Sequence, residues 1–408
     1  MNGRTRQRVG EDRSGPSAVS YASGSEWSIQ FAAFISSFDR FATPPMLLVL
    51  AARTGMTFTE VVTLFSTYLL FYALGQPLWG MVSDRFGRLI VLRSALVGGL
   101  IGGIASMVFA SFAPLTAARA WTGLMVGALY PTLMTLIGDS AQGTQRARSL
   151  SRLQVIGNLG TALATLAAGT LAALIDWRLV FGLTSAGCLA LLLALRGKRE
   201  TPRDFKGRAM RHAFKPVVLG VYGLAVLEGM VMLGAFTYIV PALEHAGVAV
   251  TVAGVLGAAY AVGIIGGARV MPGLVERFSR TRLMAIGGGI LLVGLVASTV
   301  SQSPAALTAT ATLIGASTAV LHVSIQGWAT EVAPAARATT VSFFACSMFL
   351  GSSLATFLAA PLADLGRFHM IFGLSLPAAA VLTLAASWGH GRWMARQKEP
   401  AAGLPGAV

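Results

Sequence analysis

Long apolar runs separated by short polar segments occupy almost the whole chain. A helix needs about 20 apolar residues to cross the hydrocarbon core of a bilayer. Twelve segments of that kind can be placed, centred near residues 39, 70, 99, 126, 162, 188, 228, 260, 292, 318, 350 and 379. Runs such as "LVGGLIGGIASMVFA" are apolar on every side and lack the alternation of a β-barrel strand. The pattern predicts an all-α membrane protein with twelve transmembrane helices.

The composition agrees with this prediction, since 55% of the residues are hydrophobic and only 12% are charged. Most of the 31 Lys and Arg residues fall in segments that share one side of the membrane, whereas Arg53, Arg178 and Arg367 fall on the other. Cytoplasmic loops carry the basic excess. We therefore expect both termini in the cytoplasm and a multi-pass protein of the bacterial inner (plasma) membrane.

Several function classes lack their sequence signatures. The net charge of +15 follows the predicted topology and has no nucleic-acid recognition motif beside it. The chain has no ATP-binding loop and no hydrolase or metal-ligand motif, and its two cysteines, Cys188 and Cys346, lie in separate apolar runs. We expect no enzyme activity, no metal, no cofactor and no nucleic acid, and a monomer whose surroundings are the lipid bilayer.

The chain contains an internal duplication. The segment Asp84-Arg85-Phe86-x-Arg88 has a counterpart in Glu276-Arg277-Phe278-x-Arg280, and the same spacing aligns Tyr130 with His322. The predicted parts are a cytoplasmic tail (1–27), a six-helix bundle (28–195), a basic cytoplasmic linker (196–216), a second six-helix bundle (217–389) and a cytoplasmic tail (390–408). Two parallel six-helix repeats around a central pathway are typical of alternating-access transporters.

Two motifs make a family resemblance specific. Gly80-x-x-x-Asp84-Arg85-x-Gly87-Arg88 resembles the signature loop of the major facilitator superfamily, and Arg119-x-x-x-Gly123 resembles its helix 4 arginine motif, with Thr122 in place of the usual Gln. Asp39 shortly before Pro44 is similar to helix 1 of the twelve-helix drug:proton antiporters. Residues 157–169 keep glycines but lack the proline of that branch's helix 5 motif. The resemblance implies the major facilitator fold and small-molecule transport.

The two charged turns are a predicted cytoplasmic gate. Gly87 permits a tight reversal, and Asp84 can accept hydrogen bonds from a neighbouring Arg. A charge cluster that forms in one conformation only would bias the transport cycle. The alternative is a solvated turn that only sets the topology. The gate residues are Gly80, Asp84, Arg85, Gly87, Arg88, Glu276, Arg277 and Arg280.

Two carboxylates, Asp39 and Glu228, fall near the middle of predicted helices 1 and 7. Such a group faces a cavity, finds a partner or takes up a proton, so both are candidates for proton coupling. Arg119 is the expected partner of Asp39, because Arg40 is adjacent in sequence and points about 100° away. A static Asp39–Arg119 bridge is the structural alternative. For Glu228 the sequence shows no nearby cation, and the alternative is a neutral, hydrogen-bonded carboxyl.

Six further polar residues lie in the predicted spans. They are candidates for cavity lining, although packing or hydrogen bonding between helices is the alternative for each. They are Tyr68, Tyr72, Gln154, Asn158, His322 and Gln326.

Three functions fit these features. The first is proton-coupled export of small organic, amphipathic or drug-like molecules, with protons and the substrate as partners. The second is an uptake symporter or uniporter for a metabolite on the same fold. The third is a membrane receptor or partner protein that does not transport.

Overall fold

The computed structural model describes residues 24–140, 143–197 and 210–398. The described residues form helices joined by short turns, and no strand occurs among them. In the N-terminal half the helices are α1 (Gly24–Ala42), α2 (Leu47–Thr54), α3 (Phe58–Phe86), α4 (Arg88–Val108), α5 (Phe112–Val126), α6 (Leu129–Ser140), α7 (Gly143–Leu171) and α8 (Trp177–Ala194). In the C-terminal half they are α9 (Pro216–Glu228), α10 (Ala235–Thr237), α11 (Ile239–His245), α12 (Val250–Gly257), α13 (Ala259–Arg277), α14 (Arg280–Val300), α15 (Pro304–Ser317), α16 (Val323–Val332), α17 (Arg337–Asp364) and α18 (Phe368–Lys398).

Short 3₁₀ and π segments connect several of these helices into longer ones. They are η1 (Pro44–Met46), η2 (Ala172–Asp176), η3 (Met210–Phe214), η4 (Gly229–Gly234), η5 (Thr318–His322) and η6 (Pro334–Ala336). Such irregular turns often mark functional positions in helices. Here η4 begins directly after Glu228 and η5 ends at His322.

Ten helical segments of the described chain are long and apolar enough to cross a membrane. The all-α membrane class predicted from the sequence is therefore confirmed. The count differs from twelve at two places. The first is α1, which is long enough but carries Glu26, Asp39 and Arg40 among its 19 residues. Pro44 and Pro45 separate it from α2. The second is the 47-residue segment from Arg148 to Ala194. It contains both α7 and α8 but is counted as a single spanning segment.

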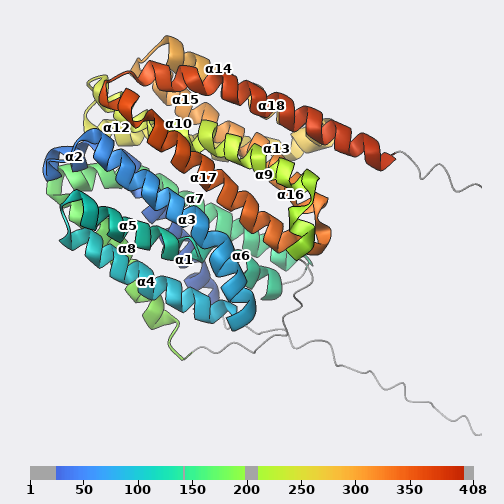
Figure 1. Ribbon diagram of the computed structural model, residues 1–408, viewed down its shortest axis with the longest axis horizontal. Coiled ribbons are helices and arrows are strands. Elements are labelled where there is room, and N and C mark those ends of the chain that lie inside the picture. Colours follow the sequence, from blue (N-terminus) through green and yellow to red (C-terminus); the bar gives the residue numbers. More distant parts are fainter. Residues whose placement is uncertain (1–23, 141–142, 198–209, 399–408) are drawn as a thin grey trace, which may run out of the picture.

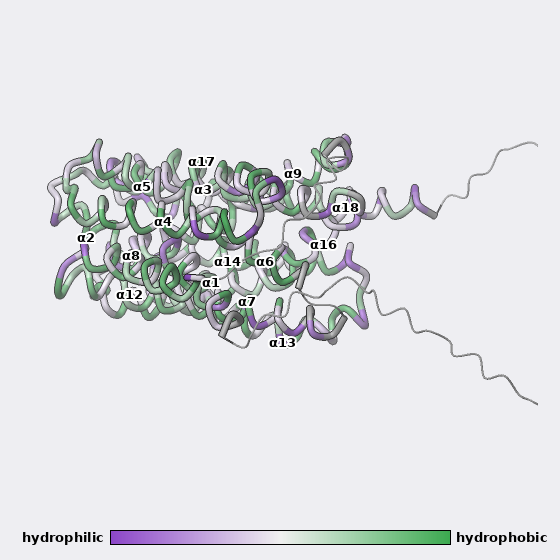
Figure 2. The backbone as a smooth tube through the Cα atoms, turned by 90° about the horizontal axis from the view of Figure 1, so that it is seen from below, coloured by the Kyte–Doolittle hydropathy of each residue, from purple (hydrophilic) through white to green (hydrophobic). Residues whose placement is uncertain are grey.

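The two halves of the chain form two groups of helices that lie side by side (Figure 1). Helices α3 and α17 are in contact along the boundary between the groups, as are α7 and α12. Polar stretches lie mainly at the ends of the bundle and apolar residues along its middle (Figure 2). We call the end of the bundle where α2 lies the α2 end, and the end where α18 finishes the α18 end.

Close glycine contacts hold the helices of each half together. A side chain at Gly123 of α5 would clash with the backbone carbonyl of Tyr68 on α3. The Arg119-x-x-x-Gly123 motif thus brings α5 against α3 at the level where Arg119 needs its partners.

Helix ends do not coincide with two of the predicted boundaries. Helix α18 continues to Lys398, well past the predicted start of the tail at 390, because His390 and Trp393 pack against Trp328 of α16. The predicted linker ends in the turn η3, where Ala213 is buried and its carbonyl accepts a hydrogen bond from Tyr222. Residues 198–209 of the predicted linker, and 1–23 and 399–408 of the predicted tails, lie outside the described residues.

Candidate functional site

Asp39 and Arg119 form a buried ion pair between α1 and α5. Arg119 donates from Nη1 to Oδ1 at 3.1 Å and from Nη2 to Oδ2 at 3.4 Å. The arginine side chain is 0% exposed and the carboxylate 1%. A bidentate guanidinium–carboxylate contact is among the strongest polar contacts in proteins. In this conformation the charge of Arg119 therefore balances the charge of Asp39.

Aromatic rings close this pair off from water. The Arg119 guanidinium lies 4.3 Å from the ring centre of Tyr68 and 4.7 Å from that of Phe181. Arg119 Nε is buried without a hydrogen-bond acceptor among the described residues. Tyr68 is therefore part of the wall around the ion pair.

Glu228 has a partner that the sequence did not reveal. Its Oε1 lies 3.0 Å from Nδ1 of His322, at the junction of α9 with η4 and of η5 with α16. Glu228 is 1% exposed, whereas His322 is 19% exposed. The sequence showed no cation near Glu228, and helix packing brings η5 with the imidazole of His322, which is charged only when protonated, against it. In the described structure Oε2 of Glu228 has no hydrogen-bond partner.

Arg40 does not pair with Asp39, as the helical spacing predicted. Its Nη1 donates to the hydroxyl of Tyr72 at 3.2 Å. The guanidinium also lies 4.7 Å from the ring centre of Phe41 and 5.0 Å from that of Phe349 on α17. Arg40 therefore faces the boundary between the two halves.

The remaining predicted lining residues lie in two places, Gln154 and Asn158 on α7 and Gln326 on α16. The hydroxyl of Tyr130 on α6 donates to Gln154 Oε1 at 2.6 Å, and Gln154 donates to Asn158 at 3.4 Å. These contacts connect α6 to α7 and leave Gln154 exposed. Gln326 is partly buried one turn after His322. Tyr130 was not among the predicted lining residues, although it contacts one of them and aligns with His322 in the repeat.

The first charged turn is ordered by contacts within itself. Gly87 has a φ of 102°, a backbone conformation that favours glycine. Arg88 donates to Asp84 Oδ1 at 2.5 Å and to Ser83 Oγ at 3.2 Å. Arg85 is exposed, and a side chain at Gly80 would lie 3.7 Å from Ser342 Oγ on α17.

The second turn is built differently. Ser279 caps α14 by accepting a hydrogen bond from the backbone N–H of Arg282, in place of a turn glycine. Arg280 forms an ion pair with Glu331 at the end of α16. Glu276 and Arg277 are exposed.

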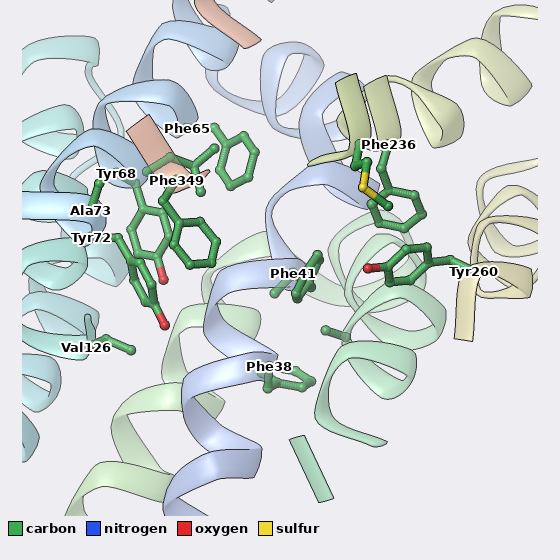
Figure 3. Packing of buried hydrophobic residues seen from close by; sticks show 14 of the residues in the cluster. Phe38, Phe41, Phe65, Tyr68, Tyr72, Ala73, Val126, Phe236, Tyr260 and Phe349 are labelled. Carbon is green, nitrogen blue, oxygen red and sulfur yellow. The ribbon is translucent and has the colours of Figure 1, made fainter. Parts of the chain in front are cut away.

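Aromatic residues from both halves meet at the centre of the molecule. Phe41 on α1 lies between Tyr72 and Phe349 on one side and Phe236 and Tyr260 on the other (Figure 3). The ring centres of Phe41 and Phe236 are 6.1 Å apart, and those of Tyr72 and Phe349 are 4.8 Å apart. The sequence could not single out these phenylalanines, because apolar residues in a membrane helix face lipid and protein alike.

The chain was compared with curated proteins. A triacylglyceride transporter of Mycobacteroides abscessus is 28% identical over 138 residues, which cover 33% of this chain and 27% of that protein. The puromycin resistance protein pur8 of Streptomyces alboniger is 32% identical over 180 residues, covering 42% of this chain and 34% of that protein. The aligned part of this chain thus spans about a quarter to a third of the length of these relatives.

Solved structures share the fold over almost the whole chain. A bacterial homologue of the human lysosomal transporter Spinster, in an inward-facing and occupied conformation, has a TM-score of 0.75 at 18% identity, covering 92% of this chain and 98% of that one. A D-xylose–proton symporter has a TM-score of 0.72 at 17% identity, covering 88% and 96%.

The family resemblance drawn from the two motifs is confirmed by a match to a family model. Residues 29–271 and 221–403 match the model described as Major Facilitator Superfamily. Together these ranges include both halves and every pair described above. The chain therefore belongs to the Major Facilitator Superfamily of membrane transporters.

Proposed function

We propose that this protein is a secondary active transporter that works by alternating access and couples proton movement to the export of small amphipathic organic molecules. One observation carries the proposal. Each half holds one buried carboxylate at its centre beside a basic partner, Asp39 with Arg119 and Glu228 with His322. Buried carboxylates in membrane helices are typical of proton pathways.

The proposed topology has twelve crossings with both termini in the cytoplasm. The segment from Arg148 to Ala194 would cross twice, because Asp176 leaves the helical conformation with φ −157° and ψ 135° and caps α8. Helices α1 and α2 would form one interrupted crossing. The α2 end then lies outside the cytoplasm, as the distribution of Lys and Arg predicts.

In this conformation the two halves are in close contact at the α2 end, which we interpret as closure of the pathway at that end. There α7 and α12 approach closely, since a side chain at Gly254 would lie 2.8 Å from the carbonyl oxygen of Thr165. His322 remains partly exposed. We assign this arrangement to the state that faces the cytoplasm.

The two pairs would have different tasks. Asp39 is sealed by Arg119 and by the ring of Tyr68, so it would become accessible only when that pair separates. Glu228 would be the acid that takes up the proton, with His322 between it and water. The partnerless Oε2 atom of Glu228 leaves room for that proton.

The substrate class rests on the aromatic centre and on the relatives. Rings of Phe41, Phe236 and Phe349 suit an apolar body. The relatives are named as transporters of triacylglycerides and as a puromycin resistance protein. Both names fit export of amphipathic compounds.

The test is proton flux in proteoliposomes with an imposed pH gradient and a panel that includes puromycin and short-chain acylglycerols. A transported compound should collapse the gradient only in vesicles that contain the protein. Antiport moves protons opposite to the compound, and an uptake symporter would move both together. Folded protein that moves neither compound nor protons would refute the proposal in favour of a receptor.

A further inference from the structure

Arg40 is a cation near the centre of the molecule, and the described part of the chain gives it no anionic partner. Among the described residues no carboxylate lies within ion-pair distance of its guanidinium, because its neighbour Asp39 is bound by Arg119. Its Nε atom is buried and has no acceptor in the described chain. The contacts it does make are one hydroxyl and three aromatic rings.

This arrangement is costly unless an anion sometimes occupies it. Arg40 is only partly buried, but a cation near the middle of a membrane helix is unfavourable unless it meets an anion or water. Contacts with the rings of Phe41, Tyr72 and Phe349 offset part of that cost. A buried N–H without an acceptor adds to it. An anionic ligand would remove both penalties at once.

The space beside Arg40 lies where such a ligand would meet both halves. A narrow pocket there is lined by Arg40 and Phe65 of the N-terminal half and by Phe236, Thr237 and Ser352 of the C-terminal half. In this conformation it has room for about one water molecule. The rest of the wall is formed by Phe41, Pro44, Leu69, Leu233 and Phe349, so the pocket offers one charge among mostly apolar side chains.

We infer that Arg40 recognises an anionic head group, of the carboxylate, sulfonate or phosphate type, on an amphipathic ligand whose apolar body packs on the surrounding rings. The inference rests on the proposed transport function for the ligand's role, but it concerns binding alone. Because the pocket spans both halves, the head group would be held at the boundary that must open and close during alternating access. Lysine lacks the planar fork of arginine but keeps the charge.

The experiment measures binding, without any gradient, of three probes that share a ten-carbon chain: decanoate, decanol and decylamine. The purified full-length protein in nanodiscs of neutral lipid is titrated calorimetrically, with empty nanodiscs subtracted. Wild-type protein should bind decanoate about tenfold or more tightly than decanol. Arg40→Lys should keep a preference for decanoate, whereas Arg40→Gln should bind the two equally and leave decanol binding unchanged. The matched control is Arg53→Gln at the α2 end, which should behave as wild type.

Equal binding of decanoate and decanol by the wild type would overturn the inference, as would a preference for decylamine or a decanoate preference that survives in Arg40→Gln. Should Arg40→Gln fail to fold, competition on the wild type decides. Displacement of decanoate by decanesulfonate but not by decylamine supports the site, and equal displacement by both refutes it. Decanoate binding without proton-linked transport of decanoate or of any panel compound would count against the transport proposal alone.

Discussion

The pair formed by Asp39 and Arg119 is the most deeply buried ionic contact described in the chain, and its energetics have two sides. Forming it recovers little more than the cost of removing two charges from water. Losing one member leaves the other charge buried without a partner, which costs roughly 3 to 5 kcal/mol. Little net free energy therefore opposes separation of the two residues during a cycle. Mutation of either residue alone is strongly destabilising.

We expect Arg119→Ala to be more damaging than Arg119→Lys, because lysine still supplies a charge to Asp39. The double variant Asp39→Asn with Arg119→Gln should recover stability, since no unpaired charge remains, but should not recover coupling. Thermal unfolding and proton-linked transport are measured on each protein. Normal transport against a gradient by the double variant would mean that the bridge only holds α1 and α5 together.

Replacement of His322 is expected to slow proton-driven accumulation more than substrate exchange. His322→Gln can still donate a hydrogen bond to Glu228 but cannot carry a proton. Substrate exchange down a gradient should therefore persist, while proton-driven accumulation slows. The measurement compares both rates with those of Gln326→Ala, one turn away on the same helix. An equal loss of both rates in His322→Gln would assign the histidine to substrate binding or packing.

The sequence identified the buried acids better than their partners. Asp39 and Glu228 stand out because a carboxylate in an apolar span is rare, and Arg119 stands out for the same reason. His322 is 94 residues from Glu228, and a neutral histidine is tolerated in a helix bundle without a charged partner. Its pairing became visible only when the packing of η5 against α9 was known.

The turn between α3 and α4 combines a required glycine with one strong ion pair. Asp84 accepts from Arg88 in the same turn and so helps to fix the turn in this state. A gate that joins the halves would need these charges to exchange partners. The proposed gating role therefore belongs to the state closed towards the cytoplasm.

Asp84→Asn should leave the protein inserted in the membrane yet slow its cycling, because it removes the carboxylate from this cluster. Glu276→Gln should do less harm, since Glu276 is exposed and the second turn is held by Ser279 and by the pair of Arg280 with Glu331. Transport rates are compared at equal expression. Near-normal rates for Asp84→Asn, or equal losses for both variants, would contradict the ranking.

Gly123→Ala should destabilise the N-terminal half by about 1 to 3 kcal/mol, because the added methyl group overlaps the carbonyl of Tyr68 and must push α5 from α3. The matched control is Gly220→Ala on α9, where an added side chain meets nothing within 4 Å. Thermal unfolding in the same detergent compares them. A neutral Gly123→Ala would show that α3 and α5 are less tightly packed than described.

Element types followed from the sequence, whereas element ends and irregular turns did not. Twenty apolar residues in a row specify a helix, but π segments such as η4 depend on how neighbouring helices pack. The break at Pro44 could have been read from the two prolines. The extension of α18 could not, because it depends on a contact of Trp393 with Trp328 across the bundle.

The two halves meet through α3 with α17 and through α7 with α12, and aromatic side chains fill the centre between them. The duplication predicted that two like bundles exist and lie parallel. It could not predict which helices meet between them or which end is closed, because one sequence must serve every state of the cycle. The states differ in packing, and only a structure selects one.

The assignment of Glu228 as the proton-binding group decides between coupled transport and its alternatives. Its test is a paired measurement on Glu228→Gln vesicles, with substrate counterflow and proton flux recorded on the same preparation. Glutamine keeps the size of the side chain and its hydrogen bonding to His322 but cannot exchange a proton. We predict that counterflow persists while proton flux and accumulation against a gradient are lost. Proton-linked accumulation retained by Glu228→Gln would contradict the proposed coupling mechanism.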